Sequence, residues 1–177
     1  MVRVERARRV ISGVMLGLVV FVMLLTSEAA AADLQTGRWV GDFSVGIIGN
    51  TTDATAFVFN LGFDRYLTEQ FTLGPLLQLG ATGDLVQTAL SGQAKYWIDL
   101  VRGEHPLRVA PQAGIGFVQA DQGRSDTSWL FPIGVELEYV LTSELRLSST
   151  VLLNFVDLDT GVGTTSIMPS FTVGVRF

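Results

Sequence analysis

The sequence predicts an all-β fold: an eight-stranded antiparallel up-and-down transmembrane β-barrel that is apolar outside and polar inside. Three observations predict it. After residue 32 the chain divides into eight segments in which apolar and polar residues alternate with a period of two. One face of these segments carries large apolar groups, and the other carries glycine, amides and charges. No stretch after Asp33 is apolar enough for a transmembrane helix, so any spanning must be done by strands.

The first 32 residues have the layout of a secretory signal peptide. Four arginines precede an apolar run from Val10 to Leu25, and an Ala-x-Ala cleavage pattern ends at Ala32. The apolar run falls short of the roughly 20 residues that a spanning helix needs, which disfavours an uncleaved membrane anchor. We therefore expect residues 1–32 to be a cleaved signal peptide and residues 33–177 to form one outer-membrane β-barrel domain.

The composition excludes several classes of function. Removing residues 1–32 would take away four arginines and two glutamates, which changes the formal net charge from −5 to −7. An acidic chain is a poor candidate for binding nucleic acid. The chain contains no cysteine, so it can form neither disulfides nor thiolate metal sites. We expect no cofactor, and the sequence leaves the oligomeric state open.

The connections between the predicted strands alternate in character. Turns at 67–70, 101–106 and 142–144 are tight, whereas the connections at 49–54, 83–86, 121–128 and 158–163 are richer in Gly, Asp, Ser and Thr. An even number of strands puts both chain ends on one side, and the tight turns are expected on the periplasmic side. Each strand meets or exceeds the 9–11 tilted residues that cross a bilayer. The predicted strands are 38–49, 55–67, 70–83, 86–100, 106–120, 128–141, 144–157 and 164–177.

The faces of the strands separate a membrane barrel from a soluble one. In segment 128–141, the residues from Trp129 to Leu141 that share one face are all large and apolar, and the other face carries Glu136 and Glu138. A soluble barrel such as a lipocalin would need the large apolar set inside. Lipid can solvate that set if it faces outward. Aromatic residues near the strand ends match two interfacial girdles: Trp39, Phe71, Tyr96, Tyr139 and Phe177 on the periplasmic side, and Phe57, Phe117 and Trp129 on the outer side.

Two segments resemble a known family. Phe171, Val173, Val175 and Phe177 share one face of the last strand, which ends the sequence on an aromatic residue. This strand resembles the closing strand of bacterial outer-membrane β-barrels, in which it is the signal read by the barrel-assembly machinery. The segment Gly62–Gly74 resembles the Gly-Phe-x-x-Tyr-Leu-Thr-x-x-Phe-x-Leu-Gly hairpin of small OmpA/OmpX/OmpW-like barrels.

The resemblance implies a cellular location and partners. It implies a place in the outer membrane of a Gram-negative bacterium, with outer-membrane lipid and lipopolysaccharide as neighbours and the barrel-assembly machinery as a partner. Specific residues match only at the hairpin and the last strand. Such motifs identify a scaffold and not an activity.

The inward face carries charges of both signs. We predict a lumen charge network of Asp42, Lys95, Arg108, Glu136, Glu138 and Arg146, with Lys95 and Arg108 facing Glu136 and Glu138 at its centre. Asp64, Asp99 and Arg176 are also predicted to point inward. The network would plug the lumen, because eight strands leave an interior just wide enough for side chains to fill. The alternative is a narrow polar conduit lined by Gln78, Gln93, Gln112 and Asn154.

Catalytic and metal sites find little support. His105 is the only histidine, and it lies in a predicted periplasmic turn. Some eight-stranded outer-membrane barrels modify lipid A with a His and a Ser near the outer leaflet, and this His is predicted at the opposite end. The outer connections carry six aspartates, which suit ordinary turns; the alternative is divalent-cation binding that bridges to lipopolysaccharide. We assign no metal site to Asp53, Asp84, Asp121, Asp126, Asp157 and Asp159.

The most economical function is non-enzymatic. We expect a structural or surface-interaction role in the cell envelope, with a lumen plugged by interior charge pairs. The first alternative is a narrow channel or a lateral transporter for small, even hydrophobic, solutes. The second is a lipid-modifying outer-membrane enzyme, for which no nucleophile–base constellation can be assembled around His105.

Overall fold

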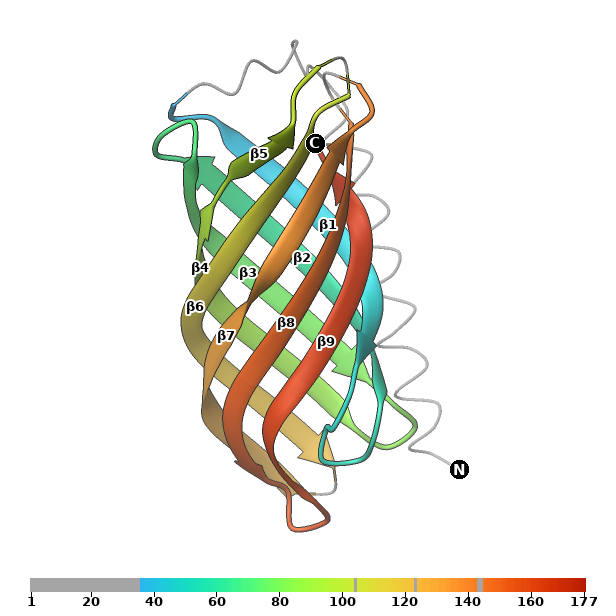
Figure 1. Ribbon diagram of the computed structural model, residues 1–177. Coiled ribbons are helices and arrows are strands. Elements are labelled where there is room, and N and C mark those ends of the chain that lie inside the picture. The colour runs from blue at the N-terminus through green and yellow to red at the C-terminus, as the bar shows by residue number, and fades with distance from the viewer. Residues whose placement is uncertain (1–35, 104, 123, 143–144) are drawn as a thin grey trace. The chain divides into compact units, whose positions relative to one another are not determined.

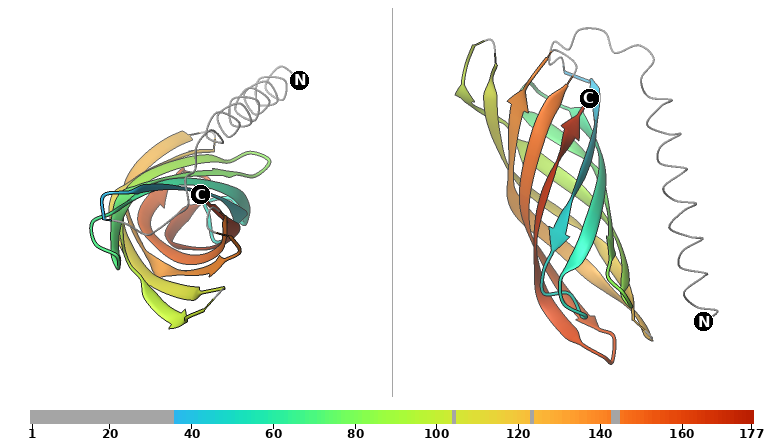
Figure 2. Two further views of the ribbon diagram at one scale, coloured as in Figure 1. Left: turned by 90° about the horizontal axis from the view of Figure 1, so that it is seen from above. Right: turned by 90° about the vertical axis from the view of Figure 1, so that its right-hand side faces the viewer.

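The strands close into a barrel. The computed structural model describes residues 36–103, 105–122, 124–142 and 145–177; the predicted signal peptide lies outside them. Sequential strands pair antiparallel, β1 pairs with β9, and β4 pairs with β6, so the sheet closes on itself (Figure 1, Figure 2). The strands of the described residues are β1 Trp39–Ile48, β2 Ala56–Tyr66, β3 Phe71–Ala81, β4 Val86–Tyr96, β5 Ile98–Val101, β6 Leu107–Gln122, β7 Arg124–Val140, β8 Arg146–Asp159 and β9 Thr164–Arg176.

Strands β4 and β5 occupy one position in the barrel. They correspond to the single predicted strand 86–100 and are separated only by Trp97. The eight-stranded antiparallel up-and-down barrel that the sequence predicts is therefore confirmed. Strand β5 pairs with β6 alone, with an irregular register between Asp99 and Val101, and all four of its residues are exposed. Asp99 lies directly opposite Arg108 and contacts its guanidinium at 3.1 Å, so it shares the inward face as predicted, but its side chain is 42% exposed because β5 has only one neighbour.

The two ends of the barrel differ in their connections. At one end lie the start of β1, the end of β9 and the turns 67–70, 102–106 and 141–145; we call it the terminal end (Figure 1). At the other, the loop end, lie the connections 49–55, 82–85 and 160–163 and the β6–β7 turn. A threonine hydroxyl accepts a hydrogen bond from the backbone N–H three residues later in five of these connections, which is the turn chemistry of this residue. The threonines are Thr51, Thr68, Thr82, Thr142 and Thr160.

The connection predicted at 121–128 is not a loop. Strands β6 and β7 stay paired to their ends, with Gln119 opposite Thr127 and Gln122 opposite Arg124. Likewise, β8 continues to Asp159 and shortens the predicted connection 158–163. Segment 121–128 is polar on both faces, and at the end of β8 the outward residues Asp157 and Asp159 are polar, so the apolar outward face that identifies a membrane strand in the sequence is lost. Strands that rise beyond the apolar zone need no apolar face, which explains why the sequence suggested loops there.

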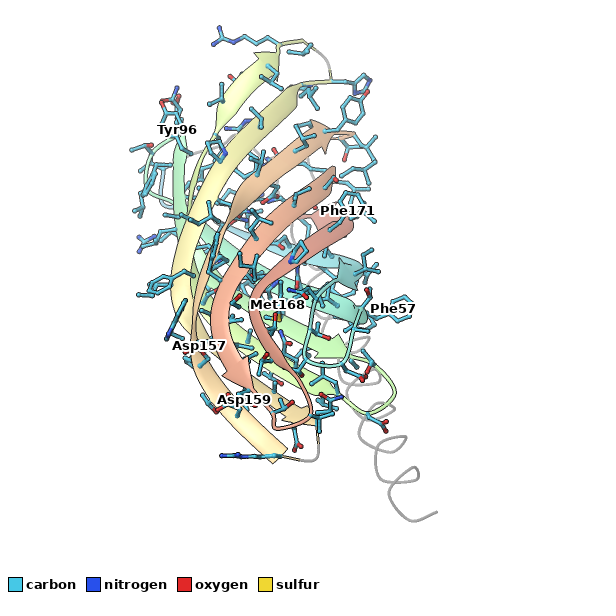
Figure 3. The ribbon with its side chains drawn as sticks, turned by 60° about the horizontal axis from the view of Figure 1, so that its bottom comes forward. Phe57, Tyr96, Asp157, Asp159, Met168 and Phe171 are labelled. Carbon is cyan, nitrogen blue, oxygen red and sulfur yellow. The ribbon has the colours of Figure 1, made fainter. Side chains whose placement is uncertain are left out.

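The outside of the barrel is apolar. Large apolar side chains alternate along every long strand with residues that point into the lumen, and Phe57, Ile115 and Trp39 are 72%, 63% and 58% exposed. Phe57 and Tyr96 project away from the wall in Figure 3. The predicted polarity, apolar outside and polar inside, is confirmed. No helix in the described part of the chain is long and apolar enough to cross a membrane.

The last strand closes the barrel against the first. The register runs from Asp42 opposite Arg176 to Ile48 opposite Ser170. Gly41 and Phe177 extend this ladder, since each donates its backbone N–H to the carbonyl of the other at 2.9 and 3.0 Å. The Phe177 ring lies so close to Gly41 that a Cβ there would approach it to 2.8 Å. Glycine at position 41 therefore lets the terminal aromatic ring lie flat on the first strand.

Candidate functional site in the barrel lumen

The lumen is stratified into three layers. On seven strands the inward-facing residues change in one order from the terminal end to the loop end: charged, then small, hydroxyl or amide, then apolar. Because inward residues recur at every second position, this order can be followed along the sequence of each strand. We call the zones the charged, amide and apolar layers. The series are Asp42–Ser44–Ile48, Asp64–Asn60–Val58, Lys95–Gln93–Ala89, Arg108–Gln112–Val118, Glu136–Gly134–Leu130, Arg146–Thr150–Val156 and Arg176–Thr172–Met168.

Arg176 joins most of the acids in the charged layer. Its guanidinium lies 2.9 Å from Asp64, 3.1 Å from Glu136 and 3.5 Å from Glu138. Lys95 places its Nζ 2.8 Å from both Asp64 and Glu136, so these two carboxylates are each shared by two cations. All five side chains are almost fully buried. A buried charge is tolerated only when it is paired, and here every pair shares a member with the next.

The remaining cations reach Glu138 from the rim. Arg108 and Arg146 each lie 3.6 Å from a Glu138 oxygen, and Arg108 also contacts the half-exposed Asp99 at 3.1 Å. Asp42 is buried but forms no ion pair with the described residues. Its carboxylate lies over Gly62, where a Cβ would approach it to 2.1 Å. The buried charges of the layer balance: Asp42, Asp64, Glu136 and Glu138 against Lys95, Arg108, Arg146 and Arg176.

Trp97 closes the charged layer at the terminal end. Trp97 is 1% exposed, and its ring centroid lies 4.6 Å from Arg176 Cζ and 5.0 Å from Arg108 Cζ. Its indole N–H donates to Thr72 Oγ1 at 3.2 Å. A cation over a tryptophan face is attracted by the ring quadrupole, and burial strengthens the attraction. The sequence analysis missed Trp97, although the alternation that places Lys95 inside also places residue 97 inside.

The predicted centre of the network is only part of the observed one. Lys95 contacts Glu136 and Arg108 contacts Glu138, which are the pairs that the sequence placed face to face. Arg176, which was placed inside but not at the centre, contacts both glutamates. Its central position arises because the closing strand β9 lies between β8 and β1, which strand parity alone does not reveal.

The apolar layer fills the loop end of the lumen. Its residues are at most 2% exposed and form one cluster. Sequence analysis did not identify it, because the inward face was characterised by its charges and glycines. Leu130 and Met168 nevertheless continue the inward parity of Glu136 and Arg176. The cluster comprises Ile48, Ala56, Val58, Leu85, Ala89, Val118, Ala120, Leu130, Val156, Leu158 and Met168.

The amide layer separates the other two. The predicted conduit residues Gln78, Gln93 and Gln112 belong to it, and Asn154 lies at its border with the apolar layer. All four are buried, with 5% exposure or less. Gln93 donates from Nε2 to Ser91 Oγ at 2.8 Å, and Asn154 donates from Nδ2 to the Met168 carbonyl at 3.1 Å. These side chains lie between the charged layer and the apolar layer.

Glycine lets the amide side chains lie across neighbouring strands. A Cβ at Gly114 would come within 2.5 Å of the Gly92 carbonyl and 2.7 Å of Gln93 Nε2, so the Gln93 amide lies over this glycine. Gly116 is as close to the backbone at Leu90 and Ser91. These contacts give the Gly114-Ile115-Gly116 segment a packing role on a strand.

The acidic loop residues take part in turn hydrogen bonds. Asp53 accepts from the Thr82 hydroxyl, Asp126 accepts from the Asp159 N–H at 2.7 Å, and Asp159 accepts from the Gly161 N–H at 2.8 Å. Within the described ranges, no group of three or more acidic or histidine side chains is placed to hold a metal ion. Asp53 and Asp84 lie in connections, as the turn interpretation predicts, whereas Asp121, Asp126, Asp157 and Asp159 lie on strands β6 to β8.

His105 lies in a terminal-end turn, as predicted. Its Nδ1 is 3.3 Å from the Val140 carbonyl, and its ring stacks on Tyr139 with centroids 6.0 Å apart. Each of these contacts fixes the ring against the rim of β7. Neither contact supplies a nucleophile that the imidazole could activate.

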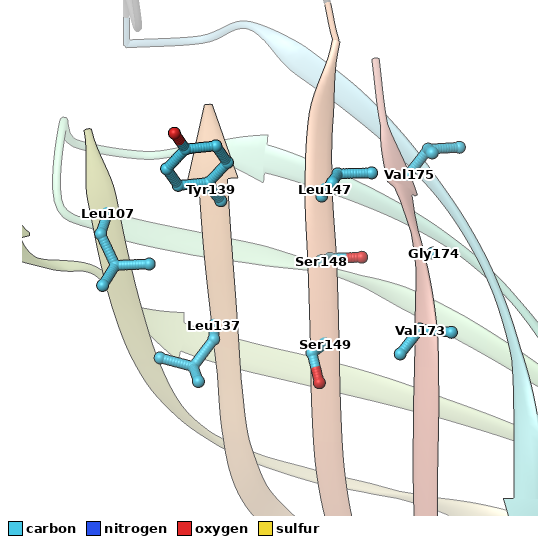
Figure 4. Close-up of a pocket in the computed structure, with 9 residues that line it drawn as sticks. All are labelled: Leu107, Leu137, Tyr139, Leu147, Ser148, Ser149, Val173, Gly174 and Val175. Atoms are coloured by element: carbon cyan, nitrogen blue, oxygen red, sulfur yellow. The ribbon is translucent and has the colours of Figure 1, made fainter. Parts of the chain in front are cut away.

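The outer wall carries one shallow apolar groove near the terminal end (Figure 4). Its volume is about 490 Å³, and it is lined by apolar side chains such as Leu137, Leu147 and Val173 around Ser149. Ser149 faces outward like its neighbours Leu147 and Val151, and its small size creates the depression. The groove lies outside the barrel and has no connection with the three lumen layers.

The fold has counterparts among solved structures. No model of a known protein family and no curated protein matches this sequence. Neisserial surface protein A aligns with a TM-score of 0.58 and 13% identity, covering 78% of this chain and 94% of that one. The N-terminal β-barrel domain of Pseudomonas aeruginosa OprF gives 0.56 and 15%, with coverages of 81% and 100%. Ail, the attachment invasion locus protein of Yersinia pestis, gives 0.50 and 14%, again with 81% and 100%. At these identities the likeness shows the fold alone.

Proposed function

We propose that this chain is a non-enzymatic outer-membrane β-barrel protein with a structural or surface-interaction role in the cell envelope, and that its lumen is plugged. The observation that carries the proposal is the inverted polarity of the barrel. Exposed apolar side chains cover the outside of the wall, and paired charges lie inside its terminal end. Monomeric soluble proteins rarely expose apolar patches above a few hundred Å², so this belt needs lipid around it.

The architecture and the predicted signal peptide and closing strand support the proposed location. A closed barrel leaves no strand edge unpaired, which satisfies every backbone group inside a bilayer. Solved barrels with this fold include Neisserial surface protein A, whose name places it on the cell surface. The predicted signal peptide and the outward set Phe171, Val173, Val175 and Phe177 suit export and delivery to the barrel-assembly machinery. In this orientation the terminal end faces the periplasm, and lipid and lipopolysaccharide surround the wall.

The plug is tested by single-channel conductance. The chain from residue 33 would be refolded into planar bilayers after a heat-modifiable gel shift has shown that the barrel is closed. The expected result is a folded barrel without stable conductance. Reproducible conductance would overturn the plug and favour the narrow-channel alternative.

The lipid-modifying alternative is tested separately. His105 lies at the terminal end, which the proposed orientation places away from the outer leaflet. Incubation of the refolded protein with lipopolysaccharide, followed by mass spectrometry of lipid A, is expected to show no modification. A modification lost in His105→Ala would contradict the non-enzymatic proposal.

A further inference from the structure

We propose that Arg65 and Trp39, on the outer wall, form a binding site for the phosphate group of a phospholipid in the periplasmic leaflet. The site draws this headgroup toward the bilayer centre on the face formed by β1, β2 and β3. This inference rests on the proposed function, since it requires the wall to lie in the outer membrane with the terminal end toward the periplasm. It adds a lipid ligand, the residues that bind it and a local change in the depth of the leaflet.

Arg65 is an isolated cation on the apolar outer wall. It is exposed on the outward face of β2, with Trp39 opposite it on β1 and Leu73 opposite it on β3. Along the chain, its outward neighbours are Phe63 and Leu67. No carboxylate of the described residues forms an ion pair with Arg65. A charge that faces lipid is costly unless it reaches a partner, so the structure assigns this role to an anion from outside the chain.

Trp39 holds the guanidinium on the wall. Arg65 Cζ lies 5.9 Å from the centroid of the Trp39 ring, and Trp39 is 58% exposed. Tryptophan is enriched where the hydrocarbon meets the headgroups, and a cation over its ring face is attracted by the ring quadrupole. A guanidinium presents a planar fork of N–H donors that binds phosphate oxygens in pairs. Lipid headgroups supply phosphate at this interface, so a phospholipid is the ligand that fits both residues.

Arg65 lies closer to the bilayer centre than the polar boundary on the opposite side of the barrel. Asp64 on β2 and Glu136 on β7 contact the same Lys95 Nζ at 2.8 Å each, so these positions lie at one level. The strands β2 and β7 lie on opposite sides of the closed sheet. Toward the terminal end, the first outward residue beyond Asp64 is Arg65. Beyond Glu136 the outward residues are instead exposed apolar or aromatic side chains: Leu137, Tyr139 and Leu141. A headgroup that meets Arg65 therefore lies deeper than one that meets the rim of β7.

Tilting of the whole barrel does not account for this difference. A tilt in a flat bilayer would shift both boundaries of the apolar belt in the same direction on a given face. At the loop end, however, an outward aromatic residue adjoins the apolar layer on both faces: Phe57 beside Val58 on β2, and Trp129 beside Leu130 on β7. The loop-end boundaries therefore coincide, and the face around Arg65 spans a shorter length of hydrocarbon. A bilayer accommodates a short apolar span by thinning locally.

Solid-state nuclear magnetic resonance tests the ligand. The isotope-labelled chain from residue 33 would be refolded into vesicles of palmitoyl-oleoyl phosphatidylcholine. Dipolar dephasing of the guanidinium nitrogens by lipid phosphorus is expected for Arg65, whose signal is assigned by its loss in Arg65→Gln. Arg176, which is buried in the lumen, is the matched control and is expected to show none. Absence of dephasing at Arg65 in a folded sample would overturn the phosphate site.

Spin-label accessibility tests the depth of the leaflet in the same vesicles. The chain contains no cysteine, so Phe63→Cys on β2 and Val135→Cys on β7 each introduce one labelling site, at matched levels on opposite faces. A water-soluble nickel chelate is expected to collide several-fold more often with the label at position 63. Adding Arg65→Leu to both variants is expected to remove the difference, whereas adding Arg102→Leu, on the exposed rim, is expected to preserve it.

The other outcomes separate this site from the proposed function. Equal and low access of the chelate at both positions would overturn the displaced leaflet and leave the membrane location standing. Access at both positions as high as at a label on Ser125→Cys, in the exposed part of β7, would contradict the membrane location itself. Low access of both the chelate and oxygen at position 63 would show that a second copy of the chain covers this face, and would overturn the lipid site.

Discussion

The two ends of the lumen are lined by opposite kinds of chemistry. At the terminal end, seven buried charges form a shared ion-pair network around Arg176, which also contacts Trp97, and an eighth, Asp42, balances the sign without an ion pair among the described residues. At the loop end, eleven apolar residues form a cluster that needs no partners of specific charge. An ion network depends on every member, because removing one leaves its neighbours uncompensated. An apolar cluster depends on volume and loses stability in proportion to the atoms removed.

Because of this difference, we expect the two ends to tolerate different kinds of substitution. In the charged layer, Asp64 and Glu136 each form ion pairs with both Lys95 and Arg176. One substitution in this layer therefore disturbs several contacts. In the apolar layer, a near-isosteric change leaves the remaining contacts in place. We therefore expect the stability of the charged layer to depend on the charge of the substituted side chain, and the stability of the apolar layer to depend on its volume.

The largest effect is expected for Arg176→Met. It would leave Asp64, Glu136 and Glu138 with less compensation in a buried site, at a cost of about 3–5 kcal/mol in the free energy of unfolding. Urea unfolding of the barrel refolded in vesicles would measure it. The matched control is Arg102→Met on the exposed rim, expected to cost less than about 1 kcal/mol. Equal effects at the two positions would contradict the central role of Arg176.

Leu130→Ala is expected to rank second. Leu130 is 1% exposed within the apolar layer, and truncating a buried leucine costs about 2–5 kcal/mol through lost contacts and the cavity left behind. The same unfolding measurement applies. Leu130→Met, which keeps the volume, should cost less than about 1.5 kcal/mol. If Leu130→Met lowered the free energy of unfolding as much as Leu130→Ala, side-chain volume would not be the property that determines the stability of the apolar layer.

The sequence predicted the wall of this barrel better than its contents. The number of strands, their antiparallel order and the outward face of residues such as Phe57 follow from alternation, which is a local property. Contacts such as Arg176 with Asp64 join residues that lie 112 positions apart. They depend on barrel closure and strand stagger, which alternation does not contain. Parity could therefore place Arg176 inside without indicating its partners.

The incomplete predictions have a related cause. The parity of β4 correctly places Asp99 on the inward face opposite Arg108, but it does not show that β5 lies along the rim with a single neighbour and leaves Asp99 42% exposed. The apolar layer and Trp97 were within reach of the same parity argument. The sequence-based prediction omitted them because it considered only the charged residues of the inward face. The transition from charged to apolar along each strand becomes visible only when all strands are aligned by register.

Gly114→Ala tests how tightly the amide layer, between the charged and apolar layers, is packed. The new Cβ would lie 2.5 Å from the Gly92 carbonyl and 2.7 Å from Gln93 Nε2, so both the backbone and the amide must move. Such overpacking costs about 1–3 kcal/mol. Gly92→Ala on the facing strand is the control, because its Cβ meets nothing within 4 Å. The two unfolding curves should therefore separate, and coincident curves would show that the amide layer is loosely packed.

The smallest effect is expected where the charged network reaches solvent. Asp99 contacts Arg108 at 3.1 Å, but its side chain is 42% exposed. Solvent screens such a pair, so Asp99→Asn should cost less than about 1 kcal/mol. The cost should fall further in about 1 M salt, where the Debye length is about 3 Å. Asp64→Asn, in the same network but 2% exposed, should cost more and respond little to salt. If the two variants showed the same cost and the same salt response, burial would not be what separates the network's interior from its rim.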